Sequence, residues 1–163
     1  MVTATASFGA HRSWWRHCPC VTRRNQFASA EAFFQNLHGR GGYSSWLDDV
    51  LHDYCEYGVL PDPDGDGVVL ACPPKVEASI YMGSSGINLH ELIPTISLPV
   101  KVLRARVREG DRTTMDFSVS PTWPELAAAF PQGVDVYLPE LTHFIPMQDP
   151  ELTAAHILDQ TKR

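Results

Sequence analysis

The chain has 163 residues, of which 44% are hydrophobic and 20% charged, and its formal net charge is -6 at pH 7. This composition is typical of a globular protein with one sizeable core, and it excludes a disordered or fibrous chain. The negative charge argues against nucleic acid or an anionic membrane as a general partner, and no apolar run has the length of about 20 residues that a membrane span requires.

The N-terminal segment differs from the rest of the chain in charge. No Asp or Glu precedes Glu31, whereas four arginines occur before that position. This balance is typical of a mitochondrial transit peptide, but the amphipathic pattern is weak. We therefore expect a solvated arm over residues 1–24 and a cytoplasmic protein, with mitochondrial import as the alternative.

The four cysteines have no disulfide-framework spacing, so we expect reduced thiols. Two of them lie near two histidines, which gives a cluster with metal-ligand residue types at the N-terminal end. A C-x-C pair without a second ligand pair does not match a structural zinc site, so no metal or other cofactor is predicted. The cluster consists of His11, His17, Cys18 and Cys20.

Residues 25–95 are predicted to be mostly helical. Ser29 and Ser45 are suited to cap two helices, the first of which carries Phe33 and Phe34 on one face. Asp48 would then occupy the third position of the second helix, and Gly58 would end that helix. A third helix is expected after the Pro73-Pro74 pair, and a short strand over residues 67–72.

The acidic run at residues 62–67 matches the first positions of a calcium-binding loop. The twelfth position is Pro73, where such a loop requires a bidentate glutamate. The preferred interpretation is a tight acidic turn that leads into the strand at 67–72.

Two strands are predicted in residues 96–163, at 100–104 and 134–138, because both segments are rich in Val and Leu. A loop and a short helix connect them, and Thr122 and Glu125 have the spacing of a capping box. A strand, helix and strand in this order form a right-handed crossover, so the two strands should be parallel. Asp149 and Pro150 predict the start of a final helix, which should run from about Pro150 to Asp159. Its apolar residues Leu152, Ala155 and Leu158 are expected to face a core.

His143 follows the second strand within a loop, where a histidine can be presented as a general base. The segments Leu141-Thr-His-Phe-Ile-Pro-Met147 and Asp149-Pro-Glu151 resemble the histidine loop of the α/β-hydrolase superfamily. Pro99-Val-Lys-Val-Leu-Arg-Ala105 is similar to that family's strand before the catalytic acid, with Ala105 in place of the usual glycine. Residues 25–95 resemble the family's helical cap. The expected fold class is therefore α/β, as a partial α/β-hydrolase fold.

The resemblance implies a catalytic acid in the loop after the first strand. Asp111 is favoured there, and Glu109 and Asp116 remain alternatives. It also implies that the cap binds a small apolar ester-like or epoxide-like molecule, and the residues proposed to line that pocket are Phe33, Phe34, Trp46 and Tyr57. Ordinary packing between helices is the alternative interpretation of these four aromatic residues.

A G-x-S-x-G nucleophile motif is missing from the sequence. Its nearest match is Gly83-Ser-Ser-Gly-Ile87, and the preceding apolar residues have helical spacing, so Ser85 is not expected to be a nucleophile. The chain is thus expected to be a hydrolase fragment that is inactive alone, or a non-catalytic remnant that binds a small ligand or a protein. So small a sheet should also leave an open edge, through which two copies can pair.

Overall fold

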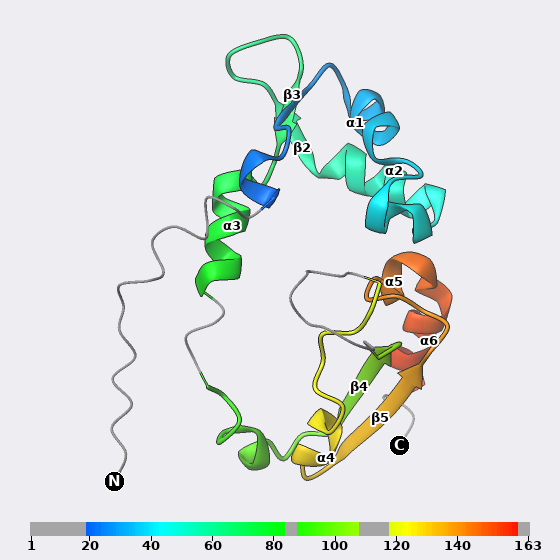
Figure 1. Cartoon of the computed structure of the whole chain (residues 1–163). Helices are drawn as coiled ribbons and strands as arrows, with labels where there is room; N and C mark the ends of the chain where they lie inside the picture. Colours follow the sequence, from blue (N-terminus) through cyan, green and yellow to red (C-terminus); the bar gives the residue numbers. More distant parts are fainter. Residues whose placement is uncertain (1–18, 84–87, 108–117, 160–163) are drawn as a thin grey trace, which may run out of the picture. The chain divides into compact units, whose positions relative to one another are not determined.

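The computed structural model describes residues 19–83, 88–107 and 118–159 (Figure 1). The chain forms two compact units, one of residues 1–33 and 54–87 and the other of residues 34–53 and 88–163. Helices α1 (Ala30–Leu37) and α2 (Asp48–Tyr57) each contribute residues to both units. None of the described helices is both long and apolar enough to cross a membrane.

The first unit contains a small antiparallel sheet in which β3 (Val68–Leu70) lies between β1 (Gln26–Phe27) and β2 (Val59–Pro61). Strand β3 confirms the strand predicted over residues 67–72, and the turn before it confirms the predicted acidic turn. The sequence analysis missed β1 and β2. Strands of two or three residues are too short to show a period of two, so only pairing with β3 defines them. The unit also contains the 3-10 helix η3 (Pro19–Thr22) and α3 (Pro74–Gly83).

The acidic turn between β2 and β3 is closed by Asp62. Its carboxylate accepts a hydrogen bond from the backbone N–H of Asp64 at 3.0 Å and another from Gln26 Nε2 at 2.9 Å. The Asp62 N–H donates to the Gly67 carbonyl at 2.9 Å. Within the described ranges, no group of three or more His, Cys, Asp or Glu residues is arranged to hold a metal ion.

Helix α1 has the predicted cap, because the Ser29 hydroxyl accepts a hydrogen bond from the Ala32 N–H at 3.1 Å. The predicted cap of α2 at Ser45 is wrong. Residues Gly41–Ser45 instead form the 3-10 helix η4, and α2 begins at Asp48. The Ser44 and Ser45 hydroxyls donate to backbone carbonyls three residues earlier, which favours the tighter turn over a capped α-helix.

The second unit is built around two parallel strands, β4 (Val100–Ala105) and β5 (Gly133–Leu138), as predicted. Their register runs from the Val100–Gly133 pair to the Ala105–Leu138 pair. The other elements are η5 (Ile93–Thr95), α4 (Leu126–Ala129), α5 (Ile145–Gln148) and α6 (Pro150–Asp159).

The predicted capping box before α4 is wrong. Helix α4 begins at Leu126 after Glu125, whose side chain makes no capping hydrogen bond. The Thr122 N–H instead donates to the Ser120 hydroxyl at 3.2 Å, in a turn before the helix. Gly133 lies close to this helix, because an added Cβ at that position would collide with the Ala127 carbonyl oxygen. This close approach requires glycine at the start of β5.

Helix α6 has the predicted bounds, and the Asp149 carboxylate caps it by accepting a hydrogen bond from the Leu152 N–H at 2.8 Å. The predicted burial of its apolar face is wrong, because α6 contains no buried residue and Leu158 is 62% exposed. Lys101 Nζ of β4 holds the helix by donating to the His156 carbonyl and to Asp159. Two strands offer too little apolar surface to cover a helix of this length.

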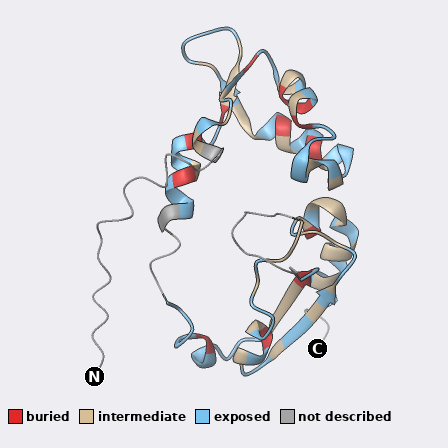
Figure 2. Cartoon of the chain, in the orientation of Figure 1, coloured by how far each residue is buried: buried red, intermediate tan, exposed pale blue. Residues whose placement is uncertain are grey.

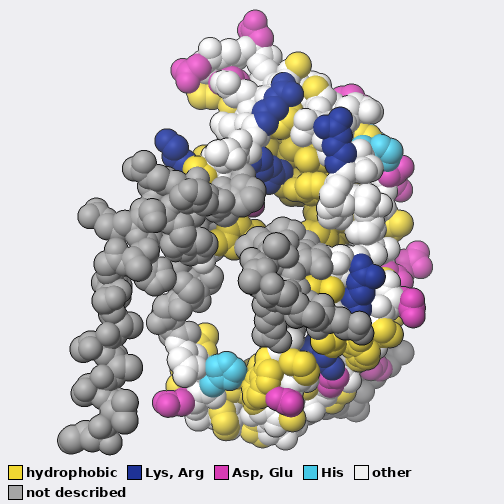
Figure 3. All heavy atoms as spheres, in the orientation of Figure 1, with side chains coloured by type: hydrophobic (Ala, Val, Ile, Leu, Met, Phe, Trp, Pro, Cys, Tyr) yellow, Lys and Arg dark blue, Asp and Glu magenta, His cyan; other side chains and the backbone are white. Residues whose placement is uncertain are grey.

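Apolar residues of the two strands are exposed or half-buried, and Figure 2 shows that β5 has exposed and intermediate positions along its length. Val134 is 54% exposed, and Val100, Val102 and Val136 are only half-buried. In Figure 3, hydrophobic side chains gather where Figure 1 draws α4 and the two strands. Among the described strands, β4 pairs with β5 alone, so its other edge has unpaired backbone groups.

We expect the isolated chain to aggregate or to pair with another copy through the open edge of β4. Each partly exposed valine forgoes on the order of 1 kcal/mol of burial, out of a typical domain stability of about 5–15 kcal/mol. Size-exclusion chromatography with thermal melting measures both properties. A monomer that melts sharply above roughly 65 °C would contradict this expectation.

Candidate active site

His143 lies in the loop that joins β5 to α5, and it is exposed to solvent. The chain turns directly after the strand, where the Leu141 N–H donates to the Leu138 carbonyl at 3.1 Å. Helix α5 then starts two residues after His143, at Ile145. The sequence predicted the loop and α6 but missed α5, because Pro146 within a four-residue helix gives no helical period.

The backbone on both sides of His143 is fixed by Gln148 of α5. The Gln148 side-chain oxygen accepts a hydrogen bond from the Thr142 N–H at 2.7 Å and another from the Thr142 hydroxyl. The same hydroxyl accepts a hydrogen bond from the Phe144 N–H at 3.3 Å. A histidine side chain that faces solvent from a fixed backbone is suited to proton transfer. Sequence reasoning missed Gln148, because no local motif links it to Thr142.

Residues 41–47 pack against this histidine loop. The ring of Trp46 meets the ring of Phe144 edge-on, with 5.3 Å between centroids. The Leu47 N–H donates to the Met147 carbonyl at 3.0 Å, and an added Cβ on Gly42 would lie 2.8 Å from Phe144 Cε2. Trp46 is therefore the proposed pocket residue that lies beside the histidine loop.

The other three proposed pocket residues have different environments. Phe33 is fully buried in the first unit. The centroid of its ring lies 4.6 Å from that of Phe27 and 5.8 Å from that of Tyr54. Phe34 is buried against His52, with 3.7 Å between ring centroids. Tyr57 is the last residue of α2 and is 80% exposed. Helix packing, the alternative interpretation, therefore accounts for Phe33 and Phe34, and Tyr57 faces solvent.

The three carboxylates proposed as the catalytic acid, Glu109, Asp111 and Asp116, lie outside the described residues. Arg106, which precedes them, is hydrogen-bonded to the histidine loop, and Ser118, which follows them, is hydrogen-bonded to Arg106. The Arg106 N–H donates to the Leu141 carbonyl at 3.3 Å, and Arg106 Nε donates to the Ser118 carbonyl at 2.6 Å. The segment that leaves β4 thus passes beside Leu141, which lies two residues before His143. Which carboxylate serves as the acid stays a prediction.

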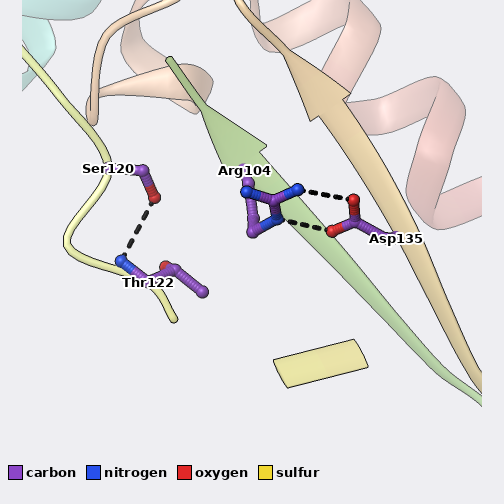
Figure 4. Close-up of polar contacts among 4 residues, drawn as sticks. All are labelled: Arg104, Ser120, Thr122 and Asp135. Carbon is purple, nitrogen blue, oxygen red and sulfur yellow. Dashed lines mark hydrogen bonds and ion pairs between the residues drawn. The ribbon is translucent and has the colours of Figure 1, made fainter. Parts of the chain in front are cut away.

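Arg104 and Asp135 form an ion pair across β4 and β5 (Figure 4). Arg104 Nε lies 2.6 Å from Asp135 Oδ1, and Arg104 Nη2 lies 2.7 Å from Oδ2. Arg104 is 7% exposed, and its guanidinium lies 5.2 Å from the ring centroid of Tyr137. The hydrogen bonds from Arg104 lower the pKa of Asp135, so this carboxylate stays ionised and engaged. Sequence reasoning missed the pair, because only the register places the two residues on one face of the sheet.

Two parallel strands joined through a helix, a histidine loop after the second strand and a final helix are the described features of a partial α/β-hydrolase fold. The crystal structure of E-2-(acetamidomethylene)succinate hydrolase is similar to this chain, with a TM-score of 0.63 and 20% sequence identity. The similarity covers 85% of this chain and 47% of that protein, so the chain spans about half the length of the hydrolase that it matches. This likeness establishes a partial α/β-hydrolase fold. No protein-family model and no curated protein matches the sequence.

Proposed function

We propose that this chain supplies the histidine and the acid of a serine-hydrolase type of active site, for a small apolar ester-like or epoxide-like substrate. The observation that carries the proposal is the exposed His143 on a loop whose backbone is held by Gln148. The partial α/β-hydrolase fold supports it. His143 follows the second of the two parallel strands, in the segment that resembles the histidine loop of that superfamily. The substrate class rests on the resemblance of residues 25–95 to a helical cap.

In this function, the His143 imidazole takes the proton of a serine hydroxyl as the serine attacks the carbonyl carbon of an ester-like substrate. It then returns that proton to the leaving group. A carboxylate in the segment 108–117, with Asp111 favoured, orients the ring and stabilises the imidazolium. Backbone N–H groups would hold the oxyanion, and the serine would come from a segment or chain outside these 163 residues.

The helix that precedes Ser84 disfavours Ser85 as a nucleophile within this chain. A nucleophile elbow joins a strand to a following helix, whereas residues Pro74–Gly83 form α3. The position of Ser85 itself lies outside the described residues. This feature favours a second candidate function, in which the chain is a non-catalytic remnant that binds a small ligand or a protein.

The experiment that tests the proposal is kinetic, with p-nitrophenyl butyrate as substrate. The protein and its variants are expressed in and isolated from their own cells, so that the segment or chain that supplies the serine is present. Replacing His143 by Gln should lower kcat by about 10³–10⁴-fold and change KM little, because the base acts in the transition state. His90→Gln is the matched control, since His90 is also exposed but packs edge-on against Trp123 at 5.2 Å. Full activity of the His143 variant would overturn the proposal, and an inactive native protein would favour the non-catalytic alternative.

A further inference from the structure

A pocket of about 290 Å³ lies in the first unit, between the end of β3, the end of α2 and the start of α3. Its lining includes Arg23, Tyr54, Leu70, Ala71, Cys72 and Glu77. The volume is at the lower limit of pockets that bind small molecules. The hydrolase function proposed above uses none of these residues.

Arg23 is held in place from several directions. Its Nη2 donates to the Tyr54 hydroxyl at 3.1 Å, and its guanidinium lies 5.7 Å from the ring centroid of Phe33. A guanidinium fixed by an aromatic ring and a phenol presents its planar donors to a carboxylate without further ordering. The Arg23 side chain is 21% exposed, so a ligand in the pocket can reach it.

The ion pair between Arg23 and Glu77 is loose. Arg23 Nη1 lies 3.5 Å from Glu77 Oε2, and this single long contact differs from the bidentate pair of Arg104 and Asp135 at 2.6 and 2.7 Å. The Glu77 side chain is 25% exposed. A long contact through one oxygen is weak, so two charged groups of a ligand can replace it with shorter hydrogen bonds.

The rest of the lining is apolar or weakly polar. Leu70 is 5% exposed at the end of β3, and Ala71 is fixed by a hydrogen bond from its N–H to the Gly58 carbonyl at 2.9 Å. Cys72 is exposed and carries a free thiol. The pocket therefore combines one positive charge, one negative charge and a small apolar surface.

We propose that this pocket binds a small zwitterionic molecule of the amino-acid class. The ligand's carboxylate accepts hydrogen bonds from Arg23, its ammonium donates to Glu77, and its aliphatic part packs against Leu70 and Ala71. A ligand with both charges is favoured because a lone anion leaves Glu77 without its partner, and a lone cation does the same to Arg23.

The experiment measures how norleucine protects Cys72 from alkylation by iodoacetamide, with peptide mass mapping to identify the modified thiol. Norleucine should slow the reaction of Cys72. Hexanoate and pentylamine, which each lack one of its two charged groups, should bind about tenfold more weakly, as expected for one lost charge-assisted hydrogen bond. Cys55 is the internal control, because it is 1% exposed and burial raises the pKa of its thiol to about 11. It should stay unmodified throughout, which also reports that the unit is folded.

Two variants decide whether the charges act as proposed. Glu77→Gln should abolish the advantage of norleucine over hexanoate, and Arg23→Gln should abolish its advantage over pentylamine. Such opposite changes in preference cannot arise from general unfolding. Equal protection by the three probes, or no protection of Cys72 by norleucine, would overturn the proposal.

Discussion

The purified 163-residue chain is expected to remain unlabelled by a fluorophosphonate probe and to hydrolyse p-nitrophenyl esters no faster than buffer. A serine hydrolase that loses its nucleophile alone loses about six orders of magnitude in kcat. Here the sequence has no G-x-S-x-G motif, and α3 occupies the residues before Ser84 where an elbow requires a strand. Intact mass spectrometry after probe treatment, together with an esterase assay, measures both results.

An active serine esterase treated in parallel confirms that the probe and the substrate work. Ser85→Ala is the matched variant, and it should behave like the unchanged chain. Stoichiometric labelling at Ser85 that this variant abolishes would contradict the expectation. It would show that residues 83–87 form a functional elbow despite the preceding helix.

Breaking the ion pair between Arg104 and Asp135 is expected to lower the free energy of unfolding by about 2 kcal/mol. Arg104→Gln removes two charge-assisted hydrogen bonds and leaves the partly buried Asp135 carboxylate without its cationic partner. Asp135 is 35% exposed in its side chain, so water offsets part of the loss and keeps the effect below that of a fully buried pair. Denaturant unfolding monitored by circular dichroism measures the change.

Asp159→Asn is the matched control for this pair. Asp159 contacts Lys101 at 3.1 Å but is 72% exposed in its side chain, so its loss should cost at most about 0.5 kcal/mol. Equal effects of the two substitutions would show that the Arg104 pair contributes no more than a surface contact.

The same pair predicts how stability depends on pH. The pKa of Asp135 is lower in the folded chain than its ordinary value of 3.8, because Arg104 donates hydrogen bonds to the ionised form. The unfolded chain therefore takes up the proton first, and the contribution of the pair is lost as the pH falls from about 5 through the lowered pKa. Asp135→Asn should flatten this part of the stability curve, and an unchanged acid limb would contradict the assignment.

Residues with strong local preferences made much of the fold predictable. Ser29 and Asp149 accept hydrogen bonds from the first turn of their helices wherever those helices pack, so the starts of α1 and α6 were correct. The parallel pairing of β4 and β5 was also correct, because a connection through a helix imposes it. For the candidate site, local sequence placed His143 in a loop after a strand, while the catalytic roles of His143 and Asp111 remain predictions.

Tertiary structure decided what depends on residues far apart in the chain. Strand β1 exists because Gln26 and Phe27 pair with Val69 and Val68, and no local pattern contains that pairing. The partnership of Arg104 with Asp135 follows from strand register in the same way. The sequence by itself determined the starts of α1 and α6 and the positions of β3, β4 and β5, because caps and side-chain periods act within a few residues. Burial, as in the exposed Leu158 of a correctly predicted helix, is decided by the surface that the rest of the fold provides.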